Sequence, residues 1–191
     1  MESKEKIEST IWEAGVALKH LEFAIRLEAY CNQDPKTDSF DHFLEEFNIP
    51  HVLELPEGRI DYNNQFSEKE IIMHSGIGIS NALAISAQVL NRLYEEADIK
   101  ICIPPKDIYC SARLYVNIIR NLFQHTTGAP VWEIIPKKQE EIKLRINDKT
   151  TIIDFRELQG KQFEYSQIGG LVLWLEVADF AISHVKELIT M

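Results

Sequence analysis

Hydrophobic positions recur at helical spacing in two long segments of the first half of the chain. In residues 4–32 the apolar side chains lie three, four or seven positions apart, and Asp34-Pro35 ends the pattern. The second helix is expected from Ser67 to about Glu96, because Ser67 and Glu70 form a capping box at its start. Small residues in this helix would let another helix approach closely: Gly76, Gly78, Ala82, Ala84 and Ala87.

Two further helices are predicted in the second half of the chain. Pro104-Pro105 and Asp107 open the third, in which an apolar stripe lies opposite a polar one, and Gly128 and Pro130 stop it. Gly169-Gly170 opens the fourth. The wide apolar face predicted for the fourth helix comprises Leu171, Trp174, Leu175, Ala178, Ala181, Ile182, Val185 and Leu188.

Between the third and fourth helices the pattern changes to that of β-strands. Residues 131–135, 143–146 and 150–154 alternate or are β-branched, and Asn147-Asp148 separates the last two runs. We therefore expect a small hairpin or three-stranded insert over about 131–155. Earlier in the chain, Phe40, Phe43, Leu44 and Phe47 predict a short helix, and the turn-forming residues of 48–66 predict an irregular loop. The sequence thus predicts one mainly α domain over 1–191, a four-helix bundle with a β insert.

Composition narrows the classes of function. The 191 residues carry a formal net charge of −10, so no general basic face is available to nucleic acid. Three cysteines without a CxxC pair, and a charged N-terminus unlike a signal peptide, favour a cytoplasmic protein with free thiols. The uncharged segment 71–90 has polar residues on all sides, which favours a buried bundle helix over a membrane span. The six histidines have no HxH or HxxxH spacing, so neither a metal site nor a cofactor is expected.

The third helix lies in a stretch without acidic residues. Residues 108–132 contain no Asp or Glu, although the chain has 30 of them. A surface that offers cations, amides and one imidazole but no carboxylate suits an anionic ligand such as phosphate. The residues that would form this surface are Arg113, Asn117, Arg120, Asn121, Gln124 and His125.

Arg120 and His125 could together cleave RNA without a metal ion. His125 has the pKa range of a general base or acid, and the planar fork of Arg120 can hold two phosphate oxygens as charge develops. Residues five apart on an ideal helix point roughly 140° apart. The two side chains therefore converge only if the helix distorts near its end or if two such helices meet across a two-fold axis. The mechanism predicts a dimer.

A structural interpretation of the same residues stays open. A histidine in the last turn of a helix can cap exposed carbonyls and interacts favourably with the helix dipole. An arginine on a polar face is commonly solvated. On this interpretation the protein is a structural dimer.

The segment Arg120-Asn121-Leu122-Phe123-Gln124-His125 resembles the Arg-x4–6-His motif of the HEPN superfamily, including the polar residue directly after the arginine. Its place late in a helix of a four-helix domain is also similar. That superfamily includes metal-independent ribonucleases, often toxins or defence effectors that act as dimers. The resemblance implies that Arg120 and His125 are catalytic and that Asn121 is supporting; we add Gln124 as a second supporting residue, and Arg113 and Asn117 as anion-binding residues.

Two hypotheses from different classes follow. The first is a HEPN-like endoribonuclease, related to toxins or defence, that works as a homodimer on RNA and has an antitoxin or another protein as partner. The second is a non-catalytic helical dimer module that uses the acid-free stretch to bind a nucleotide, RNA or a protein. Neither involves a membrane.

Overall fold

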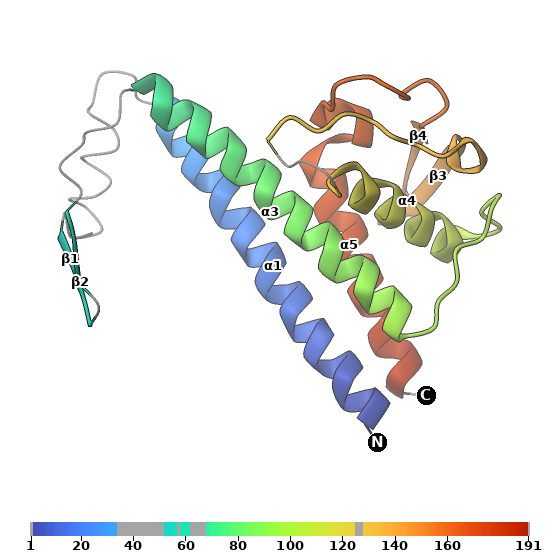
Figure 1. Ribbon diagram of the computed structural model, residues 1–191. Helices are drawn as coiled ribbons and strands as arrows, with labels where there is room; N and C mark the ends of the chain where they lie inside the picture. Colours follow the sequence, from blue (N-terminus) through green and yellow to red (C-terminus); the bar gives the residue numbers. More distant parts are fainter. Residues whose placement is uncertain (1, 34–51, 57, 62–67, 125–127, 191) are drawn as a thin grey trace. The chain divides into compact units, whose positions relative to one another are not determined.

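The fold is mainly helical. The computed structural model describes residues 2–33, 52–56, 58–61, 68–124 and 128–190. Within these ranges it contains four α-helices and two antiparallel hairpins (Figure 1). The helices are α1 (Glu2–Gln33), α3 (Glu68–Glu96), α4 (Ile108–Leu122) and α5 (Gly170–Thr190), and the strands are β1 (Val52–Leu55), β2 (Gly58–Asp61), β3 (Glu141–Ile146) and β4 (Lys149–Asp154). The chain divides into two compact units, residues 1–21 with 80–191, and residues 22–79.

The four long helices expected from the apolar spacing are confirmed. Asp107 caps α4 as predicted: its side chain accepts a 2.7 Å hydrogen bond from the backbone N–H of Cys110. However, α4 ends at Leu122, before Gly128 and Pro130, so these two residues do not terminate it. Ser67 of the expected capping box lies outside the described residues.

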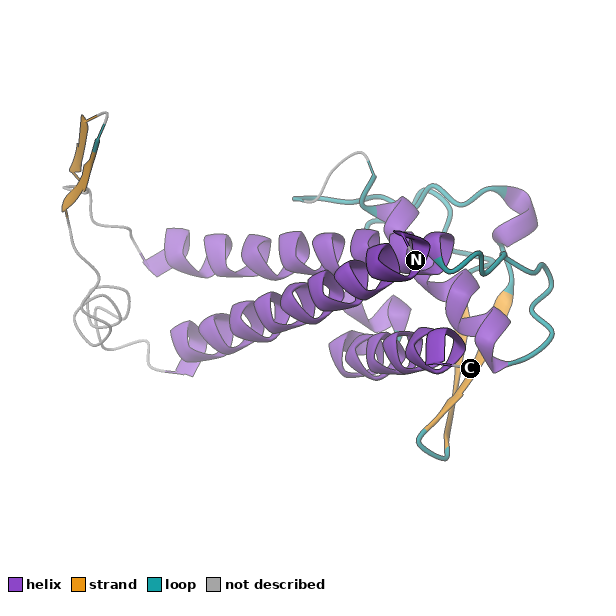
Figure 2. Cartoon of the chain, turned by 90° about the horizontal axis from the view of Figure 1, so that it is seen from below, coloured by secondary structure: helices purple, strands orange, loops and turns teal. Residues whose placement is uncertain are grey.

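In the unit formed by residues 1–21 and 80–191, α1 and α3 lie side by side (Figures 1 and 2). Thr10 donates a 2.5 Å hydrogen bond to Glu96, and Arg92 forms an ion pair with Glu13. Helix α4 contacts α5 and β3, and α5 also contacts β3. The helices of this unit thus enclose a core to which the β3–β4 hairpin adds a further side.

Aromatic side chains fill this core and anchor it by hydrogen bonds. Trp174 and Tyr115 are fully buried and lie with ring centroids 5.9 Å apart. The indole N–H of Trp174 donates to the hydroxyl of Ser86 at 3.0 Å, and the Tyr115 hydroxyl donates to the Ile168 carbonyl at 2.7 Å. Because these buried polar atoms are paired with one another, the two hydrogen bonds join α5 to α3 and α4 to the segment before α5 without the desolvation cost of leaving them unpaired.

The buried face of α5 differs in part from the predicted one. Leu173 and Val177 are buried, whereas Leu171 and Leu175 are only partly covered and Leu188 is 42% exposed. The helix presents a neighbouring stripe to the core, because almost every position around its first turns is apolar and periodicity alone does not select one face.

The predicted insert is a two-stranded hairpin. β3 and β4 pair in the register Ile146↔Lys149, and the connecting Asn147 and Asp148 have φ of 50° and 59°, as a tight type I′ turn requires. Residues 131–135, expected as a third strand, form only an isolated bridge between Val131 and Gln162. The three-stranded alternative is therefore wrong. The hairpin is confirmed.

In residues 22–79 the structure differs from the prediction of an irregular loop. The segment expected to be an irregular loop holds the β1–β2 hairpin, in which Val52 pairs with Asp61 and Leu55 with Gly58. Pro56 lies in the turn between the strands, where a missing N–H costs no ladder hydrogen bond. The short helix expected at Phe40–47 lies outside the described residues.

One helical segment among the described residues, Tyr165–Thr190, is long and apolar enough to cross a membrane by length and composition. Its mean hydropathy is 1.5, and 44% of the apolar window is buried inside the protein. A core helix passes the same test, so this finding is weak evidence for a span. In the segment 71–90, which was expected to be a buried helix, Ala82 and Ala87 are fully buried but Ile85 is 45% exposed. That helix is therefore covered on one side.

Candidate functional site

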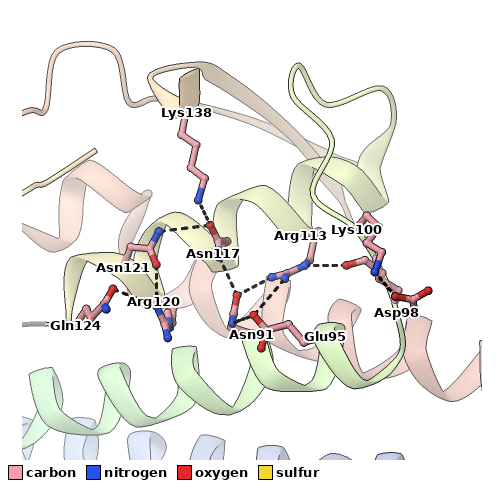
Figure 3. A network of polar contacts seen from close by, with 11 residues as sticks. Asn91, Glu95, Asp98, Lys100, Arg113, Asn117, Arg120, Asn121, Gln124 and Lys138 are labelled. Atoms are coloured by element: carbon pink, nitrogen blue, oxygen red, sulfur yellow. Dashed lines mark hydrogen bonds and ion pairs between the residues drawn. The ribbon is translucent and has the colours of Figure 1, made fainter. Parts of the chain in front are cut away.

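The polar residues of α4 divide into a buried half and an accessible half. Arg113 and Asn117 are 3% and 8% exposed, whereas Arg120 and Asn121 are partly exposed and Gln124 is exposed. All of them belong to one network of polar contacts that also includes Asn91 of α3 (Figure 3). The buried half contacts other residues of the protein, and the accessible half can be reached by a ligand.

Arg113 is fixed by partners inside the protein. Its Nε donates to the Ile99 carbonyl at 3.1 Å, and its Nη1 donates to Oδ1 of Asn91 at 2.7 Å. Nη2 lies 3.8 Å from the carboxylate of Glu95, and the guanidinium carbon lies 5.3 Å from the centre of the Tyr94 ring. Burial lowers the pKa of Arg113, and Glu95 opposes this shift. The expectation that Arg113 lies on an anion-binding surface is wrong, because burial and these contacts occupy it.

Asn117 is also a buried linker. Its Nδ2 donates to Oδ1 of Asn91 at 3.0 Å, and its own Oδ1 accepts from Nζ of Lys138 and, at 3.5 Å, from Nδ2 of Asn121. The expectation that Asn117 faces an anion on the surface is therefore corrected. It instead connects α3, α4 and Lys138.

Arg120 has different surroundings from most arginines of the chain. Its Nη1 donates to Oδ1 of Asn121 at 3.1 Å and to Oε1 of Gln124 at 3.2 Å. Both acceptors are neutral amides. Arg26, Arg92 and Arg156 each pair with a carboxylate, but no described carboxylate lies within ion-pair distance of Arg120. Its positive charge is therefore not neutralised by any residue in the ranges that the structure describes.

Arg120 lines a pocket of about 460 Å³ between α3 and α4. Arg92 of α3 lines the same pocket and was not identified from the sequence. The signal was present, because polar residues recur at helical spacing along this face of α3. The lining residues are Gln88, Val89, Asn91, Arg92, Glu95, Arg120 and Gln124.

The pocket carries mixed charge. Arg92 pairs with Glu13, and both side chains are more than a third exposed, so solvent screens this ion pair. Glu95 accepts a 2.8 Å hydrogen bond from Asn91 and faces Arg113. The pocket can therefore offer guanidinium donors to an anion, together with amides and one carboxylate that accept hydrogen bonds.

His125, the expected partner of Arg120, lies outside the described residues. The two supporting residues, Asn121 and Gln124, both contact Arg120 and hold its Nη1 group. Among the described residues no group of three His, Cys, Asp or Glu side chains has the arrangement of a metal site. Comparisons of the chain with protein-family models, with curated proteins and with solved structures found no match.

Proposed function

We propose that the protein is a HEPN-like, metal-independent endoribonuclease that binds the RNA backbone at the Arg120 pocket and cleaves it with Arg120 and His125. The proposal rests on the hydrogen bonding of the Arg120 guanidinium. Its Nη1 is held by two neutral amides, while Nε and Nη2 have no hydrogen-bond partner among the described residues.

The Nε and Nη2 groups form one edge of the guanidinium. Two parallel N–H bonds from such an edge match two oxygens of a phosphate. Because Asn121 and Gln124 fix the opposite nitrogen, the edge is oriented before a ligand arrives. Preorganised donors of this kind stabilise charge that develops in a transition state.

In the proposed reaction His125 accepts the proton of the ribose 2′-hydroxyl. The 2′ oxygen then forms a bond to phosphorus, the bond from phosphorus to the 5′ oxygen breaks, and the 5′ oxygen takes up a proton. Arg120 stabilises the charge that accumulates on the other phosphate oxygens. The products are a 2′,3′-cyclic phosphate and a 5′-hydroxyl.

The proposal includes a homodimer, because ribonucleases of the HEPN superfamily, which the Arg120–His125 motif resembles, often act as dimers. A second copy could bring the His125 of one protomer to the Arg120 of its partner. A cytoplasmic toxin or defence role, with an antitoxin or other protein as regulator, belongs to the same proposal.

The test is cleavage of a mixed RNA pool in EDTA by the wild type, Arg120→Ala, His125→Ala and Arg145→Ala. Arg145 is exposed on β3 and serves as a control for the loss of one positive charge. We expect cuts that bear cyclic phosphates with the wild type and with Arg145→Ala, and none with the other two variants. Equal cleavage by wild type and His125→Ala would reject the catalytic assignment.

Glu95 favours a second candidate function, a non-catalytic module that binds a nucleotide. Its carboxylate would repel a phosphate but can accept hydrogen bonds from the amino groups of a base, and Gln88 and Asn91 lie beside it in the pocket. Binding of a mononucleotide that Glu95→Gln weakens, without RNA cleavage by the wild type, would support this candidate.

A further inference from the structure

Lys138 brings a positive charge from outside the α-helices to the polar residues of α4. It ends the short 3-10 helix η1 (Pro136–Lys138), between α4 and β3. Its ammonium donates to Oδ1 of Asn117, as Figure 3 shows. In the part of the chain that the structure describes, Lys138 has no ion pair with a carboxylate. Like Arg120, it is held by a neutral amide.

Two asparagines, Asn117 and Asn121, connect Lys138 to Arg120. Oδ1 of Asn121 accepts from Arg120, and Nδ2 of Asn121 donates to the Asn117 oxygen that Lys138 also contacts. The two cations therefore lie at the two ends of a chain of contacts that passes through Asn117 and Asn121 (Figure 3). A ligand that contacts both cations would therefore have to extend past both asparagines.

The charges in this network do not balance. Arg113, Arg120 and Lys138 contribute three positive charges, and Glu95, which pairs with Arg113, contributes one negative charge, so the described network carries a formal charge of +2. Burial lowers the pKa of Lys138, as do the neighbouring cations Lys137, Arg113 and Arg120. The C-terminal end of the α4 dipole offsets only part of this charge. A local excess of positive charge in a chain of net charge −10 is suited to a polyanion.

We propose that Lys138 binds a second phosphate of the polynucleotide whose neighbouring phosphate is held by Arg120. This inference rests on the proposed function and deepens it, because it makes the ligand a strand with consecutive phosphates. Of these two cations, a mononucleotide would contact Arg120 and not Lys138. The segment between α4 and β3 thereby acquires a role in selecting the substrate class.

The experiment measures binding of a single-stranded 2′-O-methyl RNA over a series of salt concentrations. This RNA has no 2′-hydroxyl and is not cleaved by the proposed reaction. Each phosphate contact of a single strand contributes about 0.7 to the slope of log affinity against log salt. We expect Lys138→Gln to reduce the slope by about 0.7. Lys138→Arg should restore it, and Lys137→Gln, which removes the same charge one residue away on an exposed side chain, should leave it unchanged.

A mononucleotide gives the second measurement. We expect Lys138→Gln to lower the affinity for a nucleoside monophosphate by a smaller factor than the affinity for the RNA strand, while Arg120→Ala abolishes both. Thermal unfolding of each variant establishes that the fold is retained.

The outcomes separate the two proposals. Equal slopes for Lys138→Gln and wild type would overturn the assignment of Lys138 to a phosphate. If Lys137→Gln reduced the slope as much as Lys138→Gln does, the attraction would be diffuse, and the assignment would be overturned as well. If Lys138→Arg reduced the slope as much as Lys138→Gln does, Lys138 would act only by supporting Asn117, and the assignment would be overturned. If Arg120→Ala binds RNA like the wild type, the proposed function itself fails, and the inference fails with it.

Discussion

Arg113 of α4 donates a 2.7 Å hydrogen bond to the side-chain oxygen of Asn91 on α3, and both residues are buried. The same oxygen accepts from Asn117, so one asparagine satisfies two polar residues of α4. This arrangement lets the first part of the polar side of α4 pack within the protein. It also leaves only the C-terminal part of the polar row, around Arg120, accessible to a ligand.

Replacing Arg113 by methionine should destabilise the protein. The change removes the contacts of a buried cation with Ile99, Asn91, Glu95 and the Tyr94 ring and leaves Asn91 with one fewer donor. We therefore expect a loss of about 2–4 kcal/mol in the free energy of unfolding. Urea denaturation followed by circular dichroism measures it. Arg145→Met, on an exposed strand position, should change the value by less than about 0.5 kcal/mol. Similar stabilities for the two variants would contradict a structural role for Arg113.

Arg120→Ala should leave stability almost unchanged. Arg120 is partly exposed and contacts two neutral amides on its own helix or just beyond its end, so its removal should alter the free energy of unfolding by less than about 0.5 kcal/mol. Urea denaturation followed by circular dichroism measures this free energy as well. If this variant loses as much stability as Arg113→Met, a loss of RNA cleavage could no longer be assigned to chemistry.

Gly169→Ala should be more destabilising than Gly160→Ala. Both glycines have left-handed φ, 78° and 76°, so the backbone cost is matched at about 1 kcal/mol. A Cβ at position 169 would lie 2.5 Å from Cδ2 of Leu173 and 2.9 Å from Cδ1 of Ile153, whereas at position 160 it would meet nothing within 4 Å. We expect an additional loss of about 1–3 kcal/mol at 169 from overpacking. Equal melting temperatures would show that the core relaxes without cost.

The stability contribution of Asp154 should depend on pH. Hydrogen bonds from the side chain and backbone of Arg156 lower the pKa of Asp154 to about 2. Because the folded pKa lies below the unfolded one, the contribution is fully present above about pH 4 and is lost as the pH falls through about 2. The side chains of Asp154 and Arg156 are both about half exposed, so solvent limits this contribution to the free energy of unfolding to about 0.5 kcal/mol.

Asp154→Asn should therefore lower the melting temperature at pH 7 and in low salt, and the difference from wild type should shrink in 1 M salt. The difference should also shrink as the pH approaches 2. A difference that is the same at every pH would mean that the charge of Asp154 does not contribute.

Sequence patterns predicted the local elements well. The spacing of apolar residues predicted all four long helices, Asp107 predicted the start of α4, and Asn147-Asp148 predicted the turn between β3 and β4. Each of these depends on residues near one another in the chain. The β1–β2 hairpin was missed because Pro56 and Gly58 were interpreted as loop residues, although both are compatible with a hairpin turn.

The sequence by itself determined that α4 has a polar side and that Arg120 lies on it, because helical periodicity places those residues there. Only the tertiary structure decided which of these polar residues are buried. Arg113 and Asn117 meet Asn91, which lies 22 and 26 positions earlier in the chain, and that pairing makes their burial possible. Arg120 meets no such partner among the described residues, and Arg92 and Lys138 reach the site from other elements. Periodicity cannot reveal this division, because it records the side of a helix on which a residue lies and not what packs against that side.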